Sequence, residues 1–220
     1  MVRNVAAPPS SSVRTVVVRS VSRKRRSRNP ERAAFWVAAV MARKVLASAD
    51  VPDGVESGAM PGDREAFVAT YGPLFEHSPW VAEDAYAKGP YADRAALYDG
   101  LVEAMYAAPR ERQVALVRAH PDLAGKAAIE GTLTPDSRRE QSSAGLDRLT
   151  PGEYEALTSA NAAYRERFGF PFVICVRDHD KDSILAAAQE RARNEPDAEL
   201  RAALAEIARI AHHRLEALPA

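Results

Sequence analysis

The spacing of apolar residues predicts helices along most of the chain from residue 60 onward. Within residues 94–108 the apolar side chains recur every three or four positions and form one helical stripe: Leu97, Leu101, Val102, Met105 and Tyr106. Residues 182–193 and 197–217 are predicted as two further helices. One short run, 170–176, is continuously apolar and strand-like in composition, but a single strand cannot form a sheet.

Residues that typically begin and end helices divide this region further. Polar N-cap residues and prolines predict helix starts, while glycine and the residue before proline predict helix ends. The predicted starts are at Ser78, Asp93, Pro109, Thr134 and Thr150, and the predicted ends are at Gly89, Pro121 and Gly169. About eight helices of this length indicate an all-α fold, a compact helical bundle in a single domain.

Charge separates the first 59 residues from the rest of the chain. Residues 1–59 carry 11 basic and 4 acidic side chains, whereas residues 60–220 carry 19 and 26. The resulting net charges of +7 and −7 cancel over the whole chain. We divide the chain into a basic extension, 1–59, expected to be partly disordered and dispensable, and a helical domain, 60–220. A helix is expected at 31–49, and a true translation start near Val51 or Met60 is the alternative interpretation of the extension.

Several protein classes are excluded by composition. The single cysteine, Cys175, rules out an internal disulfide framework, and its apolar neighbours indicate a buried, inert thiol. The five histidines have no ligand-like spacing, so we expect no metal. No run of about 18 apolar residues is present, and a secretory signal fits poorly. We therefore expect a cytoplasmic protein that does not bind membranes.

His120 is the first candidate for chemistry. It falls at the predicted end of a helix, directly before Pro121, so its backbone should be extended and its ring should project from the helix terminus. A histidine there suits general acid–base catalysis near neutral pH. Taken alone, a hydrogen-bonded structural histidine is the more common interpretation. The turn-rich residues that follow favour a functional loop.

Glu140 and Arg214 are two further candidates. Ser137 and Glu140 fit a helix capping box, but Glu140 followed by Gln141 also suits a polar ligand. Arg214 lies four residues after Ile210, on the apolar stripe of the last predicted helix. A charge there requires either a structural carboxylate partner or an anionic ligand, and both remain open. Arg191 is a weaker case of the same kind.

Five segments, taken together and in order, resemble one known family. They are LFEHSPWVAEDA (74–85), HPDLAGK (120–126), EQSSAGLD (140–147), FGFPFVICVR (168–177) and ALAEIARIAHHRL (203–215). They are similar to the OHCU decarboxylases of urate degradation, and the likeness spans residues 60 to about 218. The extension finds almost no counterpart there.

This resemblance implies an all-helical carboxy-lyase that needs no cofactor. Its substrate would be 2-oxo-4-hydroxy-4-carboxy-5-ureidoimidazoline (OHCU), which loses carbon dioxide to give (S)-allantoin. The implied acid–base residue is His120, Glu140 would hydrogen-bond the ureido or hydroxyl groups, and Arg214 would meet an anionic substrate, with Glu140 as its candidate partner in the empty site. The implied substrate-binding residues are Pro121, Ser137, Arg138, Arg139, Glu140, Gln141, Phe172, Val173, Ile174, Cys175 and Val176.

Two alternatives belong to other classes. A helical binding module could use the basic arm, which includes Arg23, Lys24, Arg25 and Arg26, on nucleic acid. The acidic body and the absence of aromatic residues among these charges count against it. A catalytically dead relative would be expected to lack His120, Glu140 or Arg214. The expected partner is thus a small-molecule substrate and not nucleic acid, with a homodimer left open.

Overall fold

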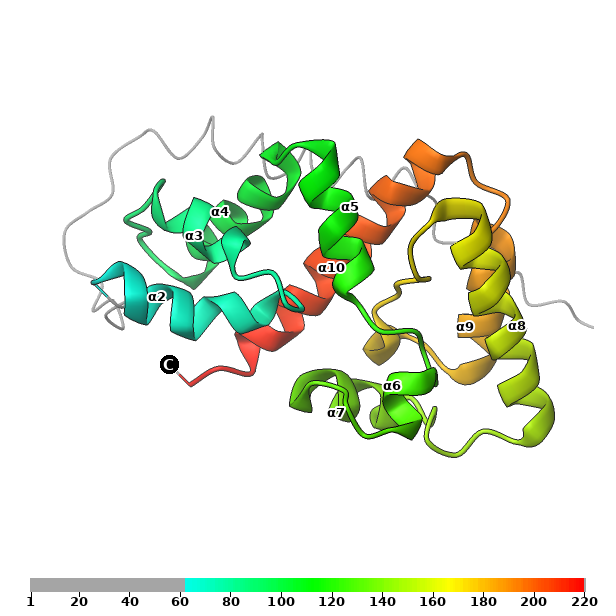
Figure 1. The fold of residues 1–220 in the computed structure, drawn as a ribbon. Coiled ribbons are helices and arrows are strands. Elements are labelled where there is room, and N and C mark those ends of the chain that lie inside the picture. Colours follow the sequence, from blue (N-terminus) through cyan, green and yellow to red (C-terminus); the bar gives the residue numbers. More distant parts are fainter. Residues whose placement is uncertain (1–61, 220) are drawn as a thin grey trace, which may run out of the picture.

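The computed structural model describes residues 62–219, whose regular secondary structure is all helical, without a β-strand (Figure 1). The elements are α2 (Arg64–Tyr71), η1 (Gly72–Leu74), α3 (Trp80–Tyr86), α4 (Arg94–Ala107), α5 (Arg110–Ala119), α6 (Lys126–Ile129), α7 (Pro135–Ser143), α8 (Pro151–Phe168), η2 (Val176–Asp178), α9 (Lys181–Arg191) and α10 (Pro196–Glu216). The predicted all-α fold is confirmed for this part of the chain. The helix predicted at 31–49 lies outside the described residues, as does the rest of the basic extension.

Most predicted helix ends are confirmed by the groups that cap them. Asp93 accepts a hydrogen bond from the Ala96 N–H at the start of α4. Thr150 and Glu153 make both hydrogen bonds of a capping box at the start of α8. Gly169 ends α8 with a φ of 72°, the left-handed conformation that glycine adopts at little cost. These ends are set by local hydrogen bonds, so they can be recognised in the sequence.

The start and end of α3 correct one prediction. The sequence predicts Ser78 as an N-cap and a helix that reaches Gly89, but α3 covers only Trp80–Tyr86. Pro79 occupies the N-cap position, and no side-chain hydrogen bond caps the helix. Ser78 instead contributes its carbonyl oxygen, which accepts from the Val81 N–H at 3.2 Å. The first turn is therefore satisfied by the backbone rather than by the serine hydroxyl.

Helix α10 is the central element of the fold. Figure 1 shows it running diagonally from the end formed by α2, α3 and α4 toward the end formed by α8 and α9. It packs against α4, α5 and η1. Its buried residues follow the predicted stripe: Leu200, Ala203, Leu204, Ile207, Ala208, Ile210, Ala211, Arg214 and Leu215. Because Arg214 belongs to that stripe, its guanidinium group lies inside the protein.

The apolar run 170–176 is the second feature that positions the site. Residues 170–175 are extended and lead from α8 into η2, without strand pairing among the described residues. All of them are buried. Since they do not join a sheet, their backbone groups need other partners, and side chains of α9 and α10 provide several of these.

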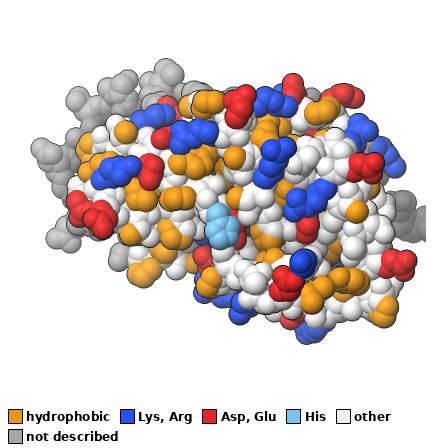
Figure 2. All heavy atoms as spheres, viewed as in Figure 1, with side chains coloured by type: hydrophobic (Ala, Val, Ile, Leu, Met, Phe, Trp, Pro, Cys, Tyr) orange, Lys and Arg blue, Asp and Glu red, His pale blue; other side chains and the backbone are white. Residues whose placement is uncertain are grey.

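Charges of both signs are mixed over the surface. Figure 2 shows Lys and Arg side chains next to Asp and Glu on the face viewed, with hydrophobic side chains between them. Nucleic-acid binding typically uses a basic stripe, so this face gives the nucleic-acid alternative no support. Within residues 62–219, no helix has the length and apolar character needed to cross a membrane.

Candidate active site

One pocket brings together most of the residues that the sequence analysis names. It lies among the end of α5, helix α7, the segment 172–177 and helix α10. Its lining residues are His120, Pro121, Leu123, Ser137, Glu140, Gln141, Phe172, Val173, Ile174, Cys175, Val176, Arg177, Ile210 and Arg214. A largely apolar pocket with a few polar groups suits a small metabolite.

His120 is held as a neutral imidazole at this pocket. It is the C-cap residue of α5, with the extended backbone that the following proline favours. Its Nδ1 lies 2.9 Å from the Leu116 carbonyl oxygen. A carbonyl oxygen only accepts, so Nδ1 carries the proton and Nε2 keeps a lone pair. Burial lowers the pKa of His120 to about 4, although the Leu116 hydrogen bond and the charge of Glu76 act to raise it. The ring can therefore accept a proton at neutral pH.

Arg214 is buried and uses its whole guanidinium group within the protein. Nε donates to Glu140 Oε1 and Nη2 to Glu140 Oε2, each at 2.8 Å. Nη2 also donates to Ser137 Oγ at 3.2 Å, while Nη1 donates to Glu76 Oε2 at 3.1 Å and to the Leu74 carbonyl at 3.4 Å. An arginine has five N–H donors. All five are thus directed at protein acceptors in this structure.

These contacts decide between two alternatives for Arg214. In the sequence it was open whether a structural carboxylate or an anionic ligand balances its charge. In the structure two carboxylates already balance that charge, Glu140 as a bidentate partner and Glu76 as a second partner. The expected pairing of Arg214 with Glu140 in the empty site is present.

Glu76 is a site residue that the sequence reasoning missed. Its side chain is only 2% exposed and accepts hydrogen bonds from Thr134 Oγ1 at 2.8 Å and Ser137 Oγ at 2.9 Å, besides that of Arg214. Burial alone would raise the pKa of Glu76, but the Thr134 hydrogen bond and the charge of Arg214 outweigh burial and lower it. Glu76 lies in one of the segments that resemble the family, and this was its only sequence signal.

The capping-box interpretation of Ser137 and Glu140 is wrong. The N-cap of α7 is Thr134, whose side chain accepts from the Ser137 N–H. The Ser137 hydroxyl donates to Glu76, and the Glu140 carboxylate pairs with Arg214. Both side chains therefore serve the pocket rather than the helix terminus.

Gln141 fixes the loop that follows His120. Its side-chain oxygen accepts from the Ala124 N–H at 2.9 Å, and Asn161 of α8 donates to the Leu123 carbonyl at 3.0 Å. Ala124 has a φ of 49°, a conformation that non-glycine residues adopt only when their surroundings hold them there. The loop is thus set by tertiary contacts from α7 and α8.

A second buried network supports the pocket wall from behind. Glu199 is fully buried in α10 and receives hydrogen bonds from Arg191, Tyr164 and Asn194. Arg191 also donates to the Val173 carbonyl at 2.8 Å. Arg191 is not among the residues that line the pocket. Arg191 therefore holds the wall in place. Its buried charge, noted in the sequence, is balanced by Glu199.

Two of the named substrate-binding residues do not reach the pocket. Arg138 donates to the Gly131 carbonyl, Arg139 pairs with Asp136, and both arginines are exposed. On the helix of Ser137 and Gln141 they point to other sides. Conversely, Leu123, Arg177 and Ile210 line the pocket and were not named. Ile210 was recognised only as a core residue, and Arg177 was marked only as the last residue of a segment that resembles the family.

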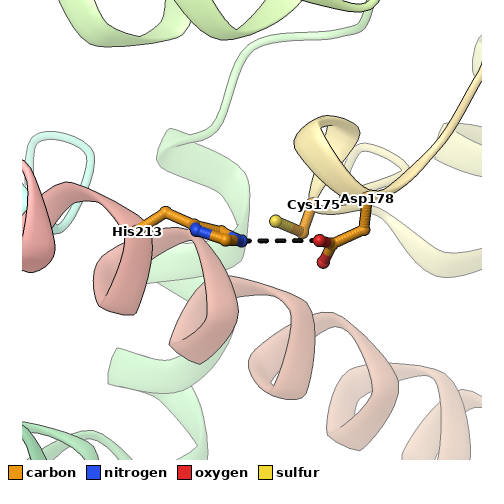
Figure 3. Close-up of side chains that lie close together, drawn as sticks. All are labelled: Cys175, Asp178 and His213. Carbon is orange, nitrogen blue, oxygen red and sulfur yellow. Dashed lines mark ion pairs between the residues drawn. The ribbon is translucent and has the colours of Figure 1, made fainter.

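One group of potential metal ligands also adjoins the pocket. Cys175, Asp178 and His213 place a sulfur, a carboxylate oxygen and an imidazole nitrogen within 4.8 Å of one another. Sequence spacing does not show this group, because α10 brings His213 to η2 from a distant part of the chain (Figure 3).

Comparison with known proteins identifies the family. The OHCU decarboxylase family profile matches residues 62–216. The chain is 42% identical over 153 residues to the 2-oxo-4-hydroxy-4-carboxy-5-ureidoimidazoline decarboxylase of Haloferax volcanii, covering 70% of this chain and 89% of that protein. The mouse (Mus musculus) enzyme of the same name is 40% identical over 153 residues, covering 70% and 86%.

A solved structure supports the same assignment. The crystal structure of an (S)-allantoin synthase superposes with a TM-score of 0.56 at 27% identity. The match covers 70% of this chain and 50% of that longer chain. The matching fold and the extent of the sequence match agree. The chain belongs to the OHCU decarboxylase family.

Proposed function

We propose that this chain decarboxylates OHCU to (S)-allantoin, a late step of urate degradation. The observation that carries this proposal is the convergence of His120, Glu140 and Arg214 on one pocket in a member of this family. Residues 120 and 214 lie in different helical segments, so only the folded chain brings them together. A small-molecule lyase therefore fits the site better than a binding module.

The substrate itself explains how decarboxylation can proceed without an added electron acceptor. The carbon that carries the carboxylate and the hydroxyl is next to a C=N bond. When the carboxylate leaves as carbon dioxide, the electron pair of the broken bond forms a C=C bond to the neighbouring carbon, and the electrons of the C=N bond move to its nitrogen, which takes up a proton from solvent. The hydroxyl then loses its proton and becomes a carbonyl, while the neighbouring carbon gains a proton and becomes the stereocentre. The protein has to orient the substrate and handle these protons.

His120 is the proposed acid–base residue. Its Nε2 has the lone pair, since the Leu116 carbonyl fixes the proton on Nδ1. With a pKa of about 4, the free ring is neutral at pH 7 and can accept the hydroxyl proton of the substrate. Once protonated, the same ring can return a proton to one face of the planar intermediate. Burial of the ring excludes water that would otherwise deliver a proton to either face.

Glu140 and Arg214 are proposed to act as one unit. Two hydrogen bonds from Arg214 fix both carboxylate oxygens of Glu140 at the pocket. A fixed carboxylate can accept hydrogen bonds from the ureido N–H groups or the hydroxyl of the substrate. Since every N–H of Arg214 already has an acceptor, we assign Arg214 to positioning Glu140 in this state rather than to direct capture of the substrate carboxylate.

Arg177 is the proposed partner of the substrate carboxylate. It lines the pocket directly after the extended wall and is exposed to solvent. The Cys175 N–H cannot take this role, because it donates to Glu206 Oε2 at 2.9 Å. Arg177→Gln should raise KM by roughly tenfold while leaving kcat nearly unchanged, as expected for loss of a ground-state charge contact. An unchanged KM would remove Arg177 from the site.

The proposed function is tested by following the chirality of the product. Freshly generated OHCU is supplied to the full chain, and allantoin is monitored by circular dichroism. Faster decarboxylation with a growing signal of one enantiomer is expected, because protonation in buffer has no preferred face. Production at the buffer rate, or racemic product, would reject the proposal. Arg139→Gln, outside the pocket, serves as the matched control for variants within it.

Three expectations about the whole protein remain proposals. We propose a cytoplasmic location and dispensability of residues 1–59, both on sequence grounds, and we leave a homodimer as an open proposal. Deletion of 1–59 should keep turnover and the melting temperature near those of the full chain. A large drop in melting temperature would contradict this. Light scattering on the purified full chain measures its oligomeric state directly.

A further inference from the structure

A cysteine, an aspartate and a histidine meet behind the pocket wall. Cys175 precedes η2, Asp178 belongs to η2, and His213 projects from α10 toward both of them (Figure 3). His213 Nε2 lies 3.5 Å from Asp178 Oδ1. Their ligand atoms and the Cys175 sulfur all lie within 4.8 Å of one another. The decarboxylation proposed above uses neither Asp178 nor His213.

The surrounding charges favour a cation at this point. Two carboxylates lie beside Cys175: Glu206 Oε2 accepts a hydrogen bond from its N–H at 2.9 Å, and Asp178 belongs to the cluster. Their negative charges attract a cation to this point. Arg209 pairs with both Asp178 and Glu206. With a divalent cation bound, the thiolate and Asp178 balance its charge, while Arg209 and Glu206 balance each other.

The Asp178 carboxylate is already arranged as a metal ligand often is. Its Oδ2 accepts a hydrogen bond from Arg209, and its Oδ1 faces His213. A ligating carboxylate is commonly hydrogen-bonded in this way through the oxygen that does not bind metal. A cation on Oδ1 therefore does not require the Arg209 pair to break.

The required movement is small. Bond lengths of about 2.3 Å to sulfur and about 2.0–2.1 Å to nitrogen place tetrahedral ligand atoms about 3.5 Å apart. The widest separations in the cluster would thus have to shorten by roughly 1 Å. The His213 side chain is 32% exposed and the Asp178 side chain 24%, so the histidine ring has room to move and a cation has a path from solvent.

We propose that Cys175 Sγ, Asp178 Oδ1 and His213 Nε2 form a binding site for a thiophilic divalent cation, with Zn²⁺ as the best-fitting case and water as its fourth ligand. The cation replaces the thiol proton, which is released to solvent. The site is inhibitory, because Cys175 also lines the substrate pocket and a bound cation ties η2 to the turn of α10 that carries Arg214. The inhibitory part rests on the proposed function, whereas the binding part does not.

Binding is tested first, without substrate. The full chain, stripped by a chelator, is titrated with Co²⁺, whose tetrahedral thiolate complexes show an intense sulfur-to-metal charge-transfer absorption. One Co²⁺ per chain, displaced by Zn²⁺ with loss of the band, is expected. Cys175→Ser should abolish the band. Absence of the band from the unchanged protein, or its persistence in Cys175→Ser, overturns the proposal.

A neighbouring histidine provides the matched control. His213→Gln should weaken Co²⁺ binding by roughly tenfold or more, since it removes a ligand, whereas His212→Gln should not. His212 is exposed and its ring lies against Tyr98. Equal affinities in the two variants would show surface binding and overturn the site.

Inhibition is measured last. Zn²⁺ should slow decarboxylation by the unchanged protein and by His212→Gln, and it should affect His213→Gln much less. If Zn²⁺ binds with the expected signature and turnover does not change, the inhibitory part is wrong. If the protein shows no decarboxylation at all, the proposed function fails while the binding result stands.

Discussion

Of two buried arginine–glutamate networks, one lines the pocket and the other contacts only protein groups. In one, Arg214 pairs with Glu140 and Glu76, and the Glu140 side chain is 14% exposed at the pocket. In the other, Arg191 pairs with Glu199, whose side chain is fully buried behind the wall. Both networks satisfy a buried cation with carboxylates.

The difference shows how the same type of contact serves two purposes. All contacts of the Arg191 network are to groups inside the protein, including the Val173 carbonyl of the pocket wall, so this network stabilises the wall. The Arg214 network includes the Glu140 carboxylate, which lines the pocket and is available to a ligand. Variants in the two networks should therefore separate loss of stability from loss of activity.

The largest effect is expected from Arg214→Met. Removing Arg214 leaves Glu140 and Glu76 close together without their cation, which should cost about 3–5 kcal/mol of unfolding free energy. Activity should also be lost, because Glu140 is no longer oriented. Urea unfolding and turnover measured on the folded fraction check both parts.

A conservative variant sharpens that result. Arg214→Lys keeps the charge but cannot donate two parallel hydrogen bonds to Glu140. It should recover part of the stability and little of the activity. Full activity in Arg214→Lys would contradict the assigned positioning role.

Arg191→Met should affect stability alone. The fully buried Glu199 would keep its Tyr164 and Asn194 contacts but lose its cation, at a cost of about 3 kcal/mol or more. The turnover of the folded fraction at low temperature should fall less than tenfold. If Arg191→Met lost as much turnover as Arg214→Met while keeping full stability, the two networks would have the same role in activity. The proposed distinction between them would then be wrong.

His120→Asn should give the opposite result to Arg191→Met. It removes the titratable group, so turnover should fall by roughly 100-fold, the usual scale for general acid–base catalysis. The unfolding free energy at pH 7 should change little, because an asparagine can keep a polar contact near Leu116. Near-normal formation of (S)-allantoin would show that His120 is structural.

The same variant should flatten the dependence of stability on pH. The pKa of His120 is about 4 in the folded protein and about 6.5 ordinarily, so the unfolded chain binds its proton first as the pH falls. Above about pH 6.5 this linkage has no effect, and as the pH falls toward 4 the folded protein loses stability on the order of a few kcal/mol. Urea unfolding across this range should show a steeper fall in the unchanged protein than in His120→Asn.

The fold was largely predictable because most helix ends depend on neighbouring residues. Asp93, Thr150 and Gly169 act within one turn of their own position, so the sequence contains the information. Ser78 was assigned wrongly because the backbone can close a helix turn without a side-chain cap.

The site was predictable only in part. The proline after it marked His120, and the apolar stripe marked Arg214. Arg138 and Arg139 were named only as part of the stretch 137–141, and their side chains are exposed outside the pocket.

Periodicity and capping are local properties, so the all-α fold, the position of most helices and the burial of Arg214 follow from the order of the residues. The contacts of Arg214 depend on how separate helices pack. Glu76 lies 138 residues before it, and nothing in the helical period relates the two positions. The meeting of Cys175 and Asp178 with His213 likewise follows from the packing of η2 against α10. Contacts between side chains of separate helices depend on how their faces fit together, and one-dimensional spacing does not encode that fit.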